Sequence, residues 1–261
     1  MPVHEVNEEA VLVAVESAPC AASFPVPFRL RRLVGPCLAL LVSALTLPHA
    51  PKVWHFTHHW LRVLPLDSFF STTTQLVSYT MIALIALMVW IQDPPRRRCL
   101  AYFAVCLILS GFASSALKQL AGRERPEWSM QSSEKHGDYG EGTLQTEGDS
   151  EFKPDGCDHW LLGRLVSHHF SDRYGSFPSG HATSAFALAA FLVALYPRAH
   201  LLWLVLAFGV ALARVWSARH FPEDVLVGAA LGWAVAWWVF SWRWPLALAD
   251  RVAELSSSRR H

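Results

Sequence analysis

Cationic side chains stand near the ends of apolar stretches in the second half of the chain. Lys118, Arg125 and Arg214 are fixed charges at a membrane surface, where an ionisable group is costly without a partner. An anion supplies such a partner. An arginine guanidinium binds phosphate oxygens bidentately, and a lysine adds a compact charge. The three residues therefore predict a phosphate site.

A short segment before the next apolar stretch adds backbone donors to this site. Pro178 is expected at the first position of a helix, where its missing N–H costs nothing. The N–H groups of Ser179, Gly180 and His181 would then point outward and bind phosphate at the positive end of the helix dipole. Gly180 allows the anion a close approach. We therefore predict Ser179 and Gly180 as phosphate-binding residues.

Two imidazoles and a carboxylate complete the candidate chemistry. Pro222 opens another helix, with His220 just before it and Asp224 in its first turn. A carboxylate that holds one imidazole nitrogen fixes the tautomer and makes the other nitrogen more basic. His220 is therefore the candidate nucleophile at phosphorus, Asp224 its orienting partner and His181 the general acid for the leaving oxygen. This scheme requires no metal.

The spacing of these residues resembles a known family. Lys118 and Arg125-Pro126, then Pro178-Ser179-Gly180-His181, then Arg214, His220 and Asp224 look like the three signature motifs of the type 2 phosphatidic acid phosphatase (PAP2) family, which also includes vanadium-dependent haloperoxidases. The resemblance covers residues 118–242. It implies a phosphohistidine on His220, protonation of a departing lipid alkoxide by His181, and no cofactor.

One residue departs from the family pattern. The third motif usually begins Ser-Arg, whereas Ala213 precedes Arg214 in this chain. The charge and the nucleophile positions are intact. We therefore expect an indirect effect on the site rather than loss of activity.

The elements that must position these residues are membrane helices. Of the 261 residues, 52% are hydrophobic and 16% are charged, against about 25% charged in soluble domains. A net charge of +1 and a pI near 7.8 do not indicate a nucleic-acid partner. We predict an all-α, six-transmembrane helical bundle with a PAP2/haloperoxidase-like core, although several blocks fall short of the roughly 20 residues that cross a bilayer. The apolar blocks are residues 33–47, 69–91, 99–117, 179–196, 201–216 and 225–242.

Basic residues between the blocks set the topology. The positive-inside rule places both termini in the cytoplasm, because arginines lie at positions 29, 31, 32, 96–98 and 198 and after residue 242. Residues 1–28 and 245–261 are then cytoplasmic tails, 29–120 and 178–244 each hold three spans, and 121–177 form a long extracytoplasmic loop. All four span ends that carry the chemistry fall on the side of this loop. The motifs were not used to place the spans, so the agreement supports both predictions.

Other polar residues are weaker candidates. His55, His58 and His59 are expected to be interfacial rather than a metal site, and five cysteines without a pairing pattern predict no structural disulfide. Four arginines either guide an anionic substrate or are solvated, and we leave them out of the site: Arg123, Arg164, Arg173 and Arg219. Small residues predict close helix packing at Ser110, Gly111, Ser114 and Ser115, and at Gly228, Ala229 and Gly232.

The sequence thus predicts an integral membrane enzyme that removes a terminal phosphate from a lipid phosphate or diphosphate at the extracytoplasmic face. The family implies undecaprenyl diphosphate, phosphatidylglycerophosphate, phosphatidic acid or a lipid A phosphate as substrate. The composition suggests a bacterial inner membrane, with the site facing the periplasm. Two alternatives remain open: a phosphotransferase that passes the phosphate to a second lipid, and a non-enzymatic six-span carrier or scaffold. The sequence does not indicate an oligomeric state.

Overall fold

The computed structural model describes residues 26, 29–75, 79–127 and 175–258. All regular structure in these residues is helical, which confirms the all-α prediction for this part of the chain. The helices are α2 (Val34–Thr46), α3 (Ala50–Val63), α4 (Asp67–Gln75), α5 (Tyr79–Gln92), α6 (Leu100–Ala121), α8 (Gly180–Leu195), α9 (His200–Trp216), α10 (Pro222–Phe240) and α11 (Trp244–Ser258). Short 3-10 turns join several of them: η2 (Leu30–Leu33), η3 (Leu47–His49), η4 (Pro94–Cys99) and η7 (Pro197–Ala199).

Four helical segments of the described residues are long and apolar enough to cross a membrane. They are Leu30–His49, Pro94–Ala121, Pro197–Trp216 and Pro222–Phe240. A fifth span would combine Ser68–Gln75 with Thr80–Gln92, which are bent by 64°. The single block predicted over 69–91 is therefore two helices. The sixth block is the shorter apolar helix Gly180–Leu195, so a count of six spans stays a prediction.

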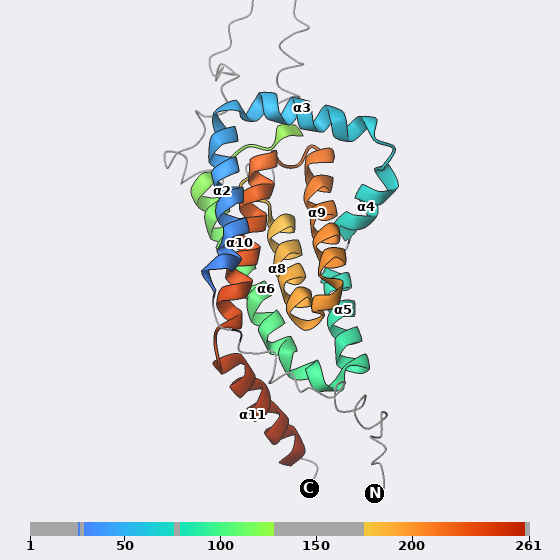
Figure 1. Cartoon of the computed structure of the whole chain (residues 1–261), viewed down its shortest axis with the longest axis vertical. Coiled ribbons are helices and arrows are strands. Elements are labelled where there is room, and N and C mark those ends of the chain that lie inside the picture. The colour runs from blue at the N-terminus through green and yellow to red at the C-terminus, as the bar shows by residue number, and fades with distance from the viewer. Residues whose placement is uncertain (1–25, 27–28, 76–78, 128–174, 259–261) are drawn as a thin grey trace, which may run out of the picture.

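The short helix α8 lies inside the bundle, where α6, α9 and α10 pack around it (Figure 1). Most of its side chains are buried. Two glycines one turn apart bring α10 close to it: a Cβ on Gly228 would lie 2.5 Å from the Ser179 carbonyl oxygen, and one on Gly232 would lie 2.0 Å from that of Thr183. The predicted close packing of α10 is thus confirmed, as expected for small residues spaced four apart.

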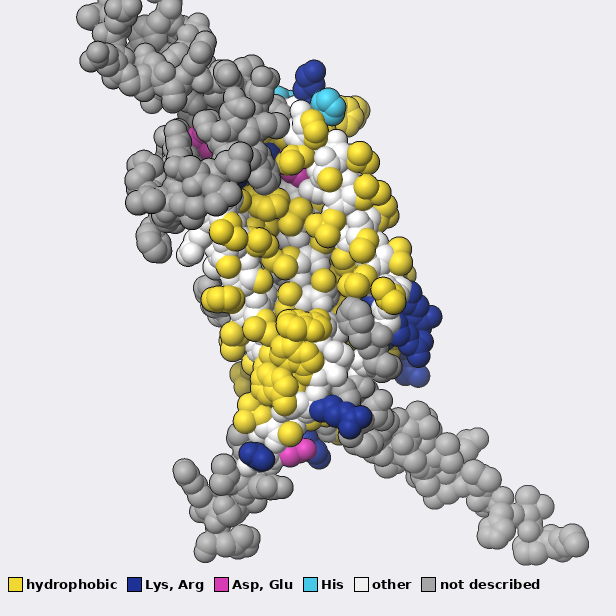
Figure 2. Space-filling model, turned by 90° about the vertical axis from the view of Figure 1, so that its left-hand side faces the viewer, with side chains coloured by type: hydrophobic (Ala, Val, Ile, Leu, Met, Phe, Trp, Pro, Cys, Tyr) yellow, Lys and Arg dark blue, Asp and Glu magenta, His cyan; other side chains and the backbone are white. Residues whose placement is uncertain are grey.

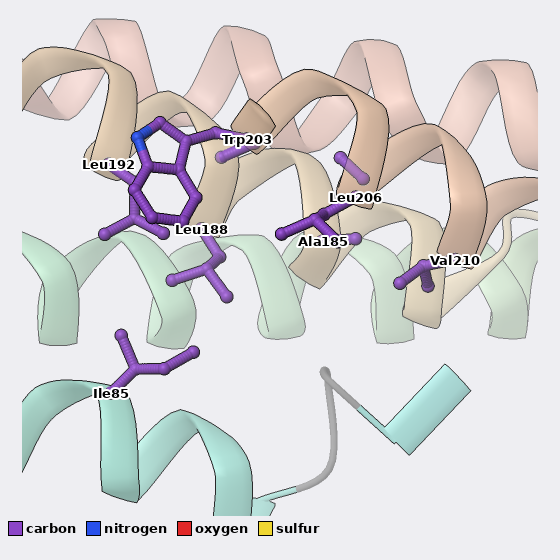
Figure 3. Close-up of a pocket in the computed structure, with 9 residues that line it drawn as sticks. Ile85, Ala185, Leu188, Leu192, Trp203, Leu206 and Val210 are labelled. Atoms are coloured by element: carbon purple, nitrogen blue, oxygen red, sulfur yellow. The ribbon is translucent and has the colours of Figure 1, made fainter. Parts of the chain in front are cut away.

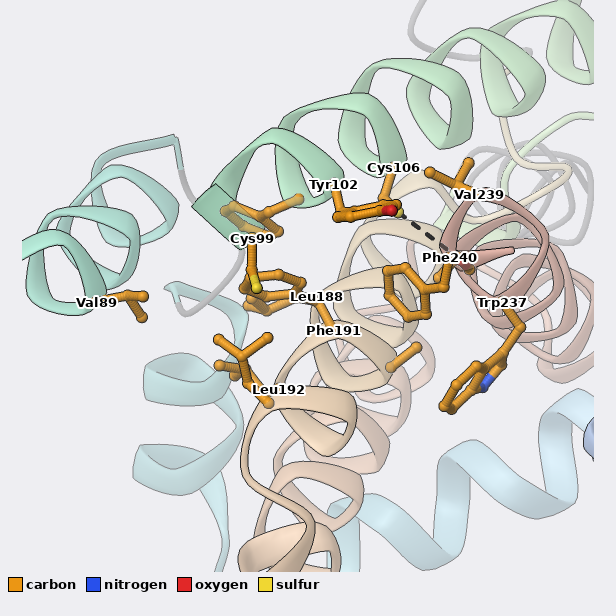
Figure 4. Close-up of a cluster of buried hydrophobic side chains, with 14 residues drawn as sticks. Val89, Cys99, Tyr102, Cys106, Leu188, Phe191, Leu192, Trp237, Val239 and Phe240 are labelled. Atoms are coloured by element: carbon orange, nitrogen blue, oxygen red, sulfur yellow. Dashed lines mark hydrogen bonds between the residues drawn. The ribbon is translucent and has the colours of Figure 1, made fainter. Parts of the chain in front are cut away.

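The packing prediction for α6 is only half right. Ser110 and Ser114 are buried, but Gly111 and Ser115 are exposed, and a Cβ on Gly111 would meet nothing within 4 Å. Further along this side of the bundle, aromatic rings fill the space between α6, α8 and α10 (Figure 4). Phe103 stacks on Phe191 with ring centres 4.8 Å apart.

Large apolar side chains also cover much of the outer surface. Figure 2 shows a broad hydrophobic band on one face, with Lys and Arg side chains gathered toward its margins. Exposure of such a large apolar surface to water is unfavourable, whereas contact with lipid chains is not. The chain is therefore an integral membrane protein. Exposed members include Leu38, Leu41 and Leu45 on α2, Ile108 and Phe112 on α6, and Leu201, Val205 and Phe208 on α9.

Helix α3 lies across one end of the upright helices (Figure 1). Its Trp54 is buried in a hydrophobic cluster that also includes Ala182 of α8, Val215 of α9 and Val225 of α10. His58 stacks on Trp54 at 4.4 Å between ring centres. Helix α3 therefore packs against α9 and α10 at this end of the bundle.

Helix α11 covers most of the predicted C-terminal tail, whose place in the cytoplasm stays a prediction. Cys99 is disulfide-bonded, which contradicts the expectation of no disulfide, and its partner lies outside the described residues. The predicted tail 1–28 and loop 121–177 also lie almost entirely outside the described residues, so they stay predictions.

Candidate active site

The end of α6 sets the spacing between Lys118 and Arg125. Lys118 lies in the last turn, and the N–H of Gly122 donates to its carbonyl at 3.0 Å. Gly122 has a φ of 55°, a left-handed conformation that favours glycine and ends helices. The chain therefore leaves the helix there and carries Arg123 and Arg125 back into the protein, where both are buried.

The end of α9 joins Arg214 to His220 through the backbone. Ala218 also has a φ of 55°, so the chain reverses directly after the helix. The N–H groups of Arg219 and His220 then donate to the carbonyl of Arg214, at 3.1 and 3.2 Å. This turn explains the spacing of the two residues and fixes His220 beside the helix end.

The start of α8 differs from the sequence prediction. The helix begins at Gly180 with Ser179 at the N-cap, so Pro178 precedes the helix instead of opening it. The N–H of Ser179 donates to the Asp224 carbonyl at 3.0 Å. The prediction that this N–H points outward is therefore wrong, because α10 packs directly against it.

Other donors remain at this helix start. The N–H groups of Gly180 and His181 belong to the first turn, which has no intrahelical acceptor for them. The buried hydroxyl of Ser179 has no hydrogen-bond partner among the described residues. A Cβ added to Gly180 would lie 3.6 Å from Lys118 Nζ, so the lysine ammonium lies beside these donors.

The ring of His220 is held by a backbone carbonyl. Its Nδ1 lies 2.6 Å from the Ser176 oxygen. A carbonyl only accepts, so Nδ1 carries the proton and Nε2 keeps its lone pair. The nearest oxygen of Asp224, Oδ2, lies 3.9 Å from Nδ1, beyond hydrogen-bond range. That oxygen instead accepts from the Ser176 hydroxyl at 2.5 Å and from the Phe221 N–H at 3.0 Å. In this geometry, Asp224 acts on His220 through its neighbours.

Two charged residues that the sequence analysis did not place in the site lie behind Asp224. Arg123 donates to Asp224 and, at 2.6 Å, to Glu223. Both carboxylates are fully buried, and Arg123 is nearly so. One sequence signal could have identified Arg123 and Glu223: a second acidic residue, Glu223, stands beside Asp224 at the start of a helix that is otherwise apolar. A carboxylate buried there needs a cation as partner.

The electrostatic environment favours a neutral imidazole. Burial lowers the pKa of His220 well below its usual value, and Arg214, Lys118 and Arg125 lower it further, against a smaller raising effect of the Ser176 carbonyl. The same three cations interact with His181, whose side chain is exposed at the start of α8. The structure thus brings both histidines and all three predicted cations together.

Of the arginines that the sequence left out of the site, Arg219 lies at its rim. Arg219 donates to Glu127 at 3.0 Å, and Arg125 lies 4.0 Å from the same carboxylate, so Glu127 bridges the rim of the site. Arg164 and Arg173 lie outside the described residues. Within the described residues, no group of three or more histidine, cysteine or acidic side chains is arranged to hold a metal.

The fold and this geometry define a helical membrane protein with two histidines and three cations gathered at one end of its bundle. The sequence model of the PAP2 superfamily matches residues 99–247, which span α6 to α11 and every residue of the predicted site. The chain belongs to this superfamily.

Curated relatives share parts of the chain. It is 38% identical over 79 residues to the bacitracin transport permease protein BcrC of Bacillus licheniformis, covering 30% of the chain and 37% of the relative. It is 30% identical over 132 residues to lipid A 1-phosphatase of Rhizobium etli, covering 51% of the chain and 45% of the relative. A crystal structure of Aquifex aeolicus LpxE matches with a TM-score of 0.46 and 20% identity, covering 69% of this chain and 88% of that one. The chain thus spans less than half the length of these two curated relatives.

Proposed function

We propose that the protein is a membrane lipid phosphatase that hydrolyses a terminal phosphate from a lipid phosphate or diphosphate through a phosphohistidine on His220. One observation carries the proposal. A buried imidazole, with Nδ1 bonded to a carbonyl, interacts with three cations at the start of a helix. This arrangement supplies a nucleophile and an anion site together.

The proposed reaction has two steps. Nε2 of His220 attacks phosphorus, a P–N bond forms and the bond to the lipid oxygen breaks, while His181 gives that oxygen a proton. Lys118, Arg125 and Arg214 stabilise the charge on the transferred group. His181 then takes a proton from water, the water oxygen attacks phosphorus, and the P–N bond breaks to release phosphate. Neither step uses a metal.

The charge balance of the site supports a phosphate substrate. The charged groups that its contacts place in the site or at its rim are Lys118, Arg123, Arg125, Arg214, Arg219, Glu127, Glu223 and Asp224. By formal charge, five cations against three carboxylates leave two positive charges. A phosphate monoester carries about 1.5 to 2 negative charges at neutral pH, so it would neutralise this surplus.

An apolar cavity supports a lipid as the carrier of that phosphate. It lies between α5, α8 and α9, with Ala185 and Val210 at the end nearer the site and Leu192 and Trp203 at the other (Figure 3). Ala185 follows His181 by about one helical turn. A larger cavity of about 420 Å³ shares Leu192 and Trp203 and continues to Tyr196. The cavity nearer the site holds about 50 Å³, and Gln92 and Asp93 also line the larger one. We therefore expect a hydrocarbon chain to contact the apolar side chains that the two cavities share, Ile85, Leu192 and Trp203.

The substrate candidates are lipid A phosphates, undecaprenyl diphosphate, phosphatidylglycerophosphate and phosphatidic acid. Lipid A phosphates gain support from the names of two kinds of relative, because lipid A 4'-phosphatase of Bacteroides thetaiotaomicron is also 38% identical over 63 residues, covering 23% of this chain and 28% of that one. The arginine distribution supports a site on the periplasmic face of a bacterial inner membrane.

The test is a panel of these lipids offered singly to the purified protein in detergent, with released phosphate as the readout. We expect release from at least one lipid and its loss in His181→Ala and His220→Ala. His200→Ala is the matched control, since His200 is exposed at the start of α9, away from the site. Release only when a second lipid is added would favour the phosphotransferase. No release and no phosphoenzyme with any lipid would favour the carrier or scaffold.

A further inference from the structure

Arg123 contacts three residues that are linked to His220: Ser176, whose carbonyl binds Nδ1, Phe221, which follows His220 in the chain, and Asp224, which accepts from both. We propose that Arg123 is a positioning residue, which sets the orientation of His220 through these three neighbours without touching the substrate. The expected loss of activity in Arg123 variants rests on the proposed function. The expected change in the position of the His220 imidazole does not depend on that function.

Arg123 is linked to His220 through three separate contacts, one from its backbone and two from its guanidinium. The carbonyl of Arg123 accepts the Ser176 N–H at 3.0 Å, and Ser176 is the residue whose carbonyl binds His220 Nδ1. The guanidinium carbon lies 4.0 Å from the ring centre of Phe221, which follows His220 in the chain. The guanidinium donates to Asp224, which in turn accepts from Ser176 and Phe221.

Only an arginine fits this position. Its two terminal nitrogens donate separately to Asp224 and Glu223, which are adjacent in sequence at the start of α10. A lysine ammonium lacks the planar fork that serves two acceptors and stacks on an aromatic ring. Burial alone would lower the pKa of Arg123, but Asp224 and Glu223 together raise it, so the charge is retained.

Glu223 fixes the plane of the guanidinium. With Asp224 alone, the guanidinium could rotate about one hydrogen bond, whereas a second acceptor on the neighbouring residue defines its plane. The guanidinium carbon lies over the ring of Phe221. Glu223 therefore supports the same orientation from one step further away, and its loss should cost less than the loss of Arg123.

The kinetic test compares Arg123→Ala, Arg123→Lys and Glu223→Gln with Arg98→Ala. Arg98 is the matched control, because it pairs with Asp250 at 3.0 Å and is exposed, with no contact to the site. We expect kcat to fall about a hundredfold in Arg123→Ala and about tenfold or more in Arg123→Lys, with KM changed less than about threefold. The kcat of Glu223→Gln should fall less than that of Arg123→Ala. Added guanidinium ion should restore part of the kcat of Arg123→Ala.

Two kinetic outcomes would overturn the proposal. A rise in KM with unchanged kcat would make Arg123 a substrate-binding residue. Full kcat in Arg123→Lys, with the elution profile and thermal midpoint of the unmodified protein, would show that the fork is not needed.

A second measurement separates this proposal from the proposed function. In protein labelled with ¹⁵N-histidine, the Nδ1–H signal of His220 is the one that His220→Ala removes. We expect Arg123→Ala to shift or broaden it and Arg98→Ala to leave it in place. A shifted signal in a protein that hydrolyses no lipid phosphate would reject the function and keep the positioning role. An unshifted signal in folded Arg123→Ala would reject the positioning role whatever the activity.

Discussion

At the scale of single residues, the site depends on an imidazole that stays neutral among cations. His220 is buried, and its Nδ1 is committed to the Ser176 carbonyl. Burial and the surrounding cations both disfavour the imidazolium. A nucleophile needs the lone pair on Nε2, so the cations that we propose to bind phosphate would also keep His220 in the reactive form.

The pH dependence of activity tests this coupling. Because Arg214, Lys118 and Arg125 lower the pKa of His220, the acid limb of kcat/KM should lie below the usual histidine value of about 6.5. Lys118→Met removes one repelling charge, so the pKa should rise and the limb should move to higher pH. Lys52→Met on the exposed surface of α3 is the control and should leave the limb in place. An acid limb in Lys118→Met that coincides with that of the unmodified protein would contradict the coupling.

The departure at Ala213 gives a second prediction at this scale. Ala213 is fully buried next to Arg214, and a serine there would place its hydroxyl where the helix carbonyl one turn earlier can accept it. We expect Ala213→Ser to change phosphatase activity by less than about a hundredfold, or roughly 2.7 kcal/mol of barrier. A larger gain in released phosphate would mean that this position touches the reacting group.

At the scale of elements, helix ends and one helix contact assemble the site. Left-handed residues at Gly122 and Ala218 turn the chain after α6 and α9, which sets the distances from Lys118 to Arg125 and from Arg214 to His220. The glycine face of α10 then lets its start reach the start of α8, where Asp224 accepts the Ser179 N–H.

Substitution of Gly232 tests the helix contact. A Cβ there would lie 2.0 Å from the Thr183 carbonyl oxygen, so α8 or α10 must move. We expect Gly232→Ala to lower stability by about 1 to 3 kcal/mol and to reduce activity as the start of α8 shifts. Gly111→Ala is the control, because its Cβ meets nothing within 4 Å. Equal thermal midpoints of the two variants in detergent would contradict the close contact.

At the scale of the whole molecule, most of the apolar helices could be predicted from sequence because each is a continuous apolar run. The broken span at α4 and α5 could not, since Phe69 and Thr73 of α4 are held against Gly209 of α9, a contact that no local pattern reveals. Helix α3 could not either: three histidines make it look like a loop, and only the burial of Trp54 shows which face it covers. The cations and histidines of the site were predictable from spacing. The place of Arg123 in the site was not predictable, because it depends on a hydrogen bond to Glu223, which lies 100 residues later in the chain.

The covalent intermediate gives the most direct test of the central claim. The purified protein would be mixed with a ³²P-labelled lipid phosphate that it hydrolyses, quenched in base and digested, and the labelled peptide identified by mass spectrometry. We expect an acid-labile phosphohistidine at His220, absent in His220→Ala and present in His200→Ala. Hydrolysis at the normal rate by His220→Ala, or label on another residue, would contradict the account.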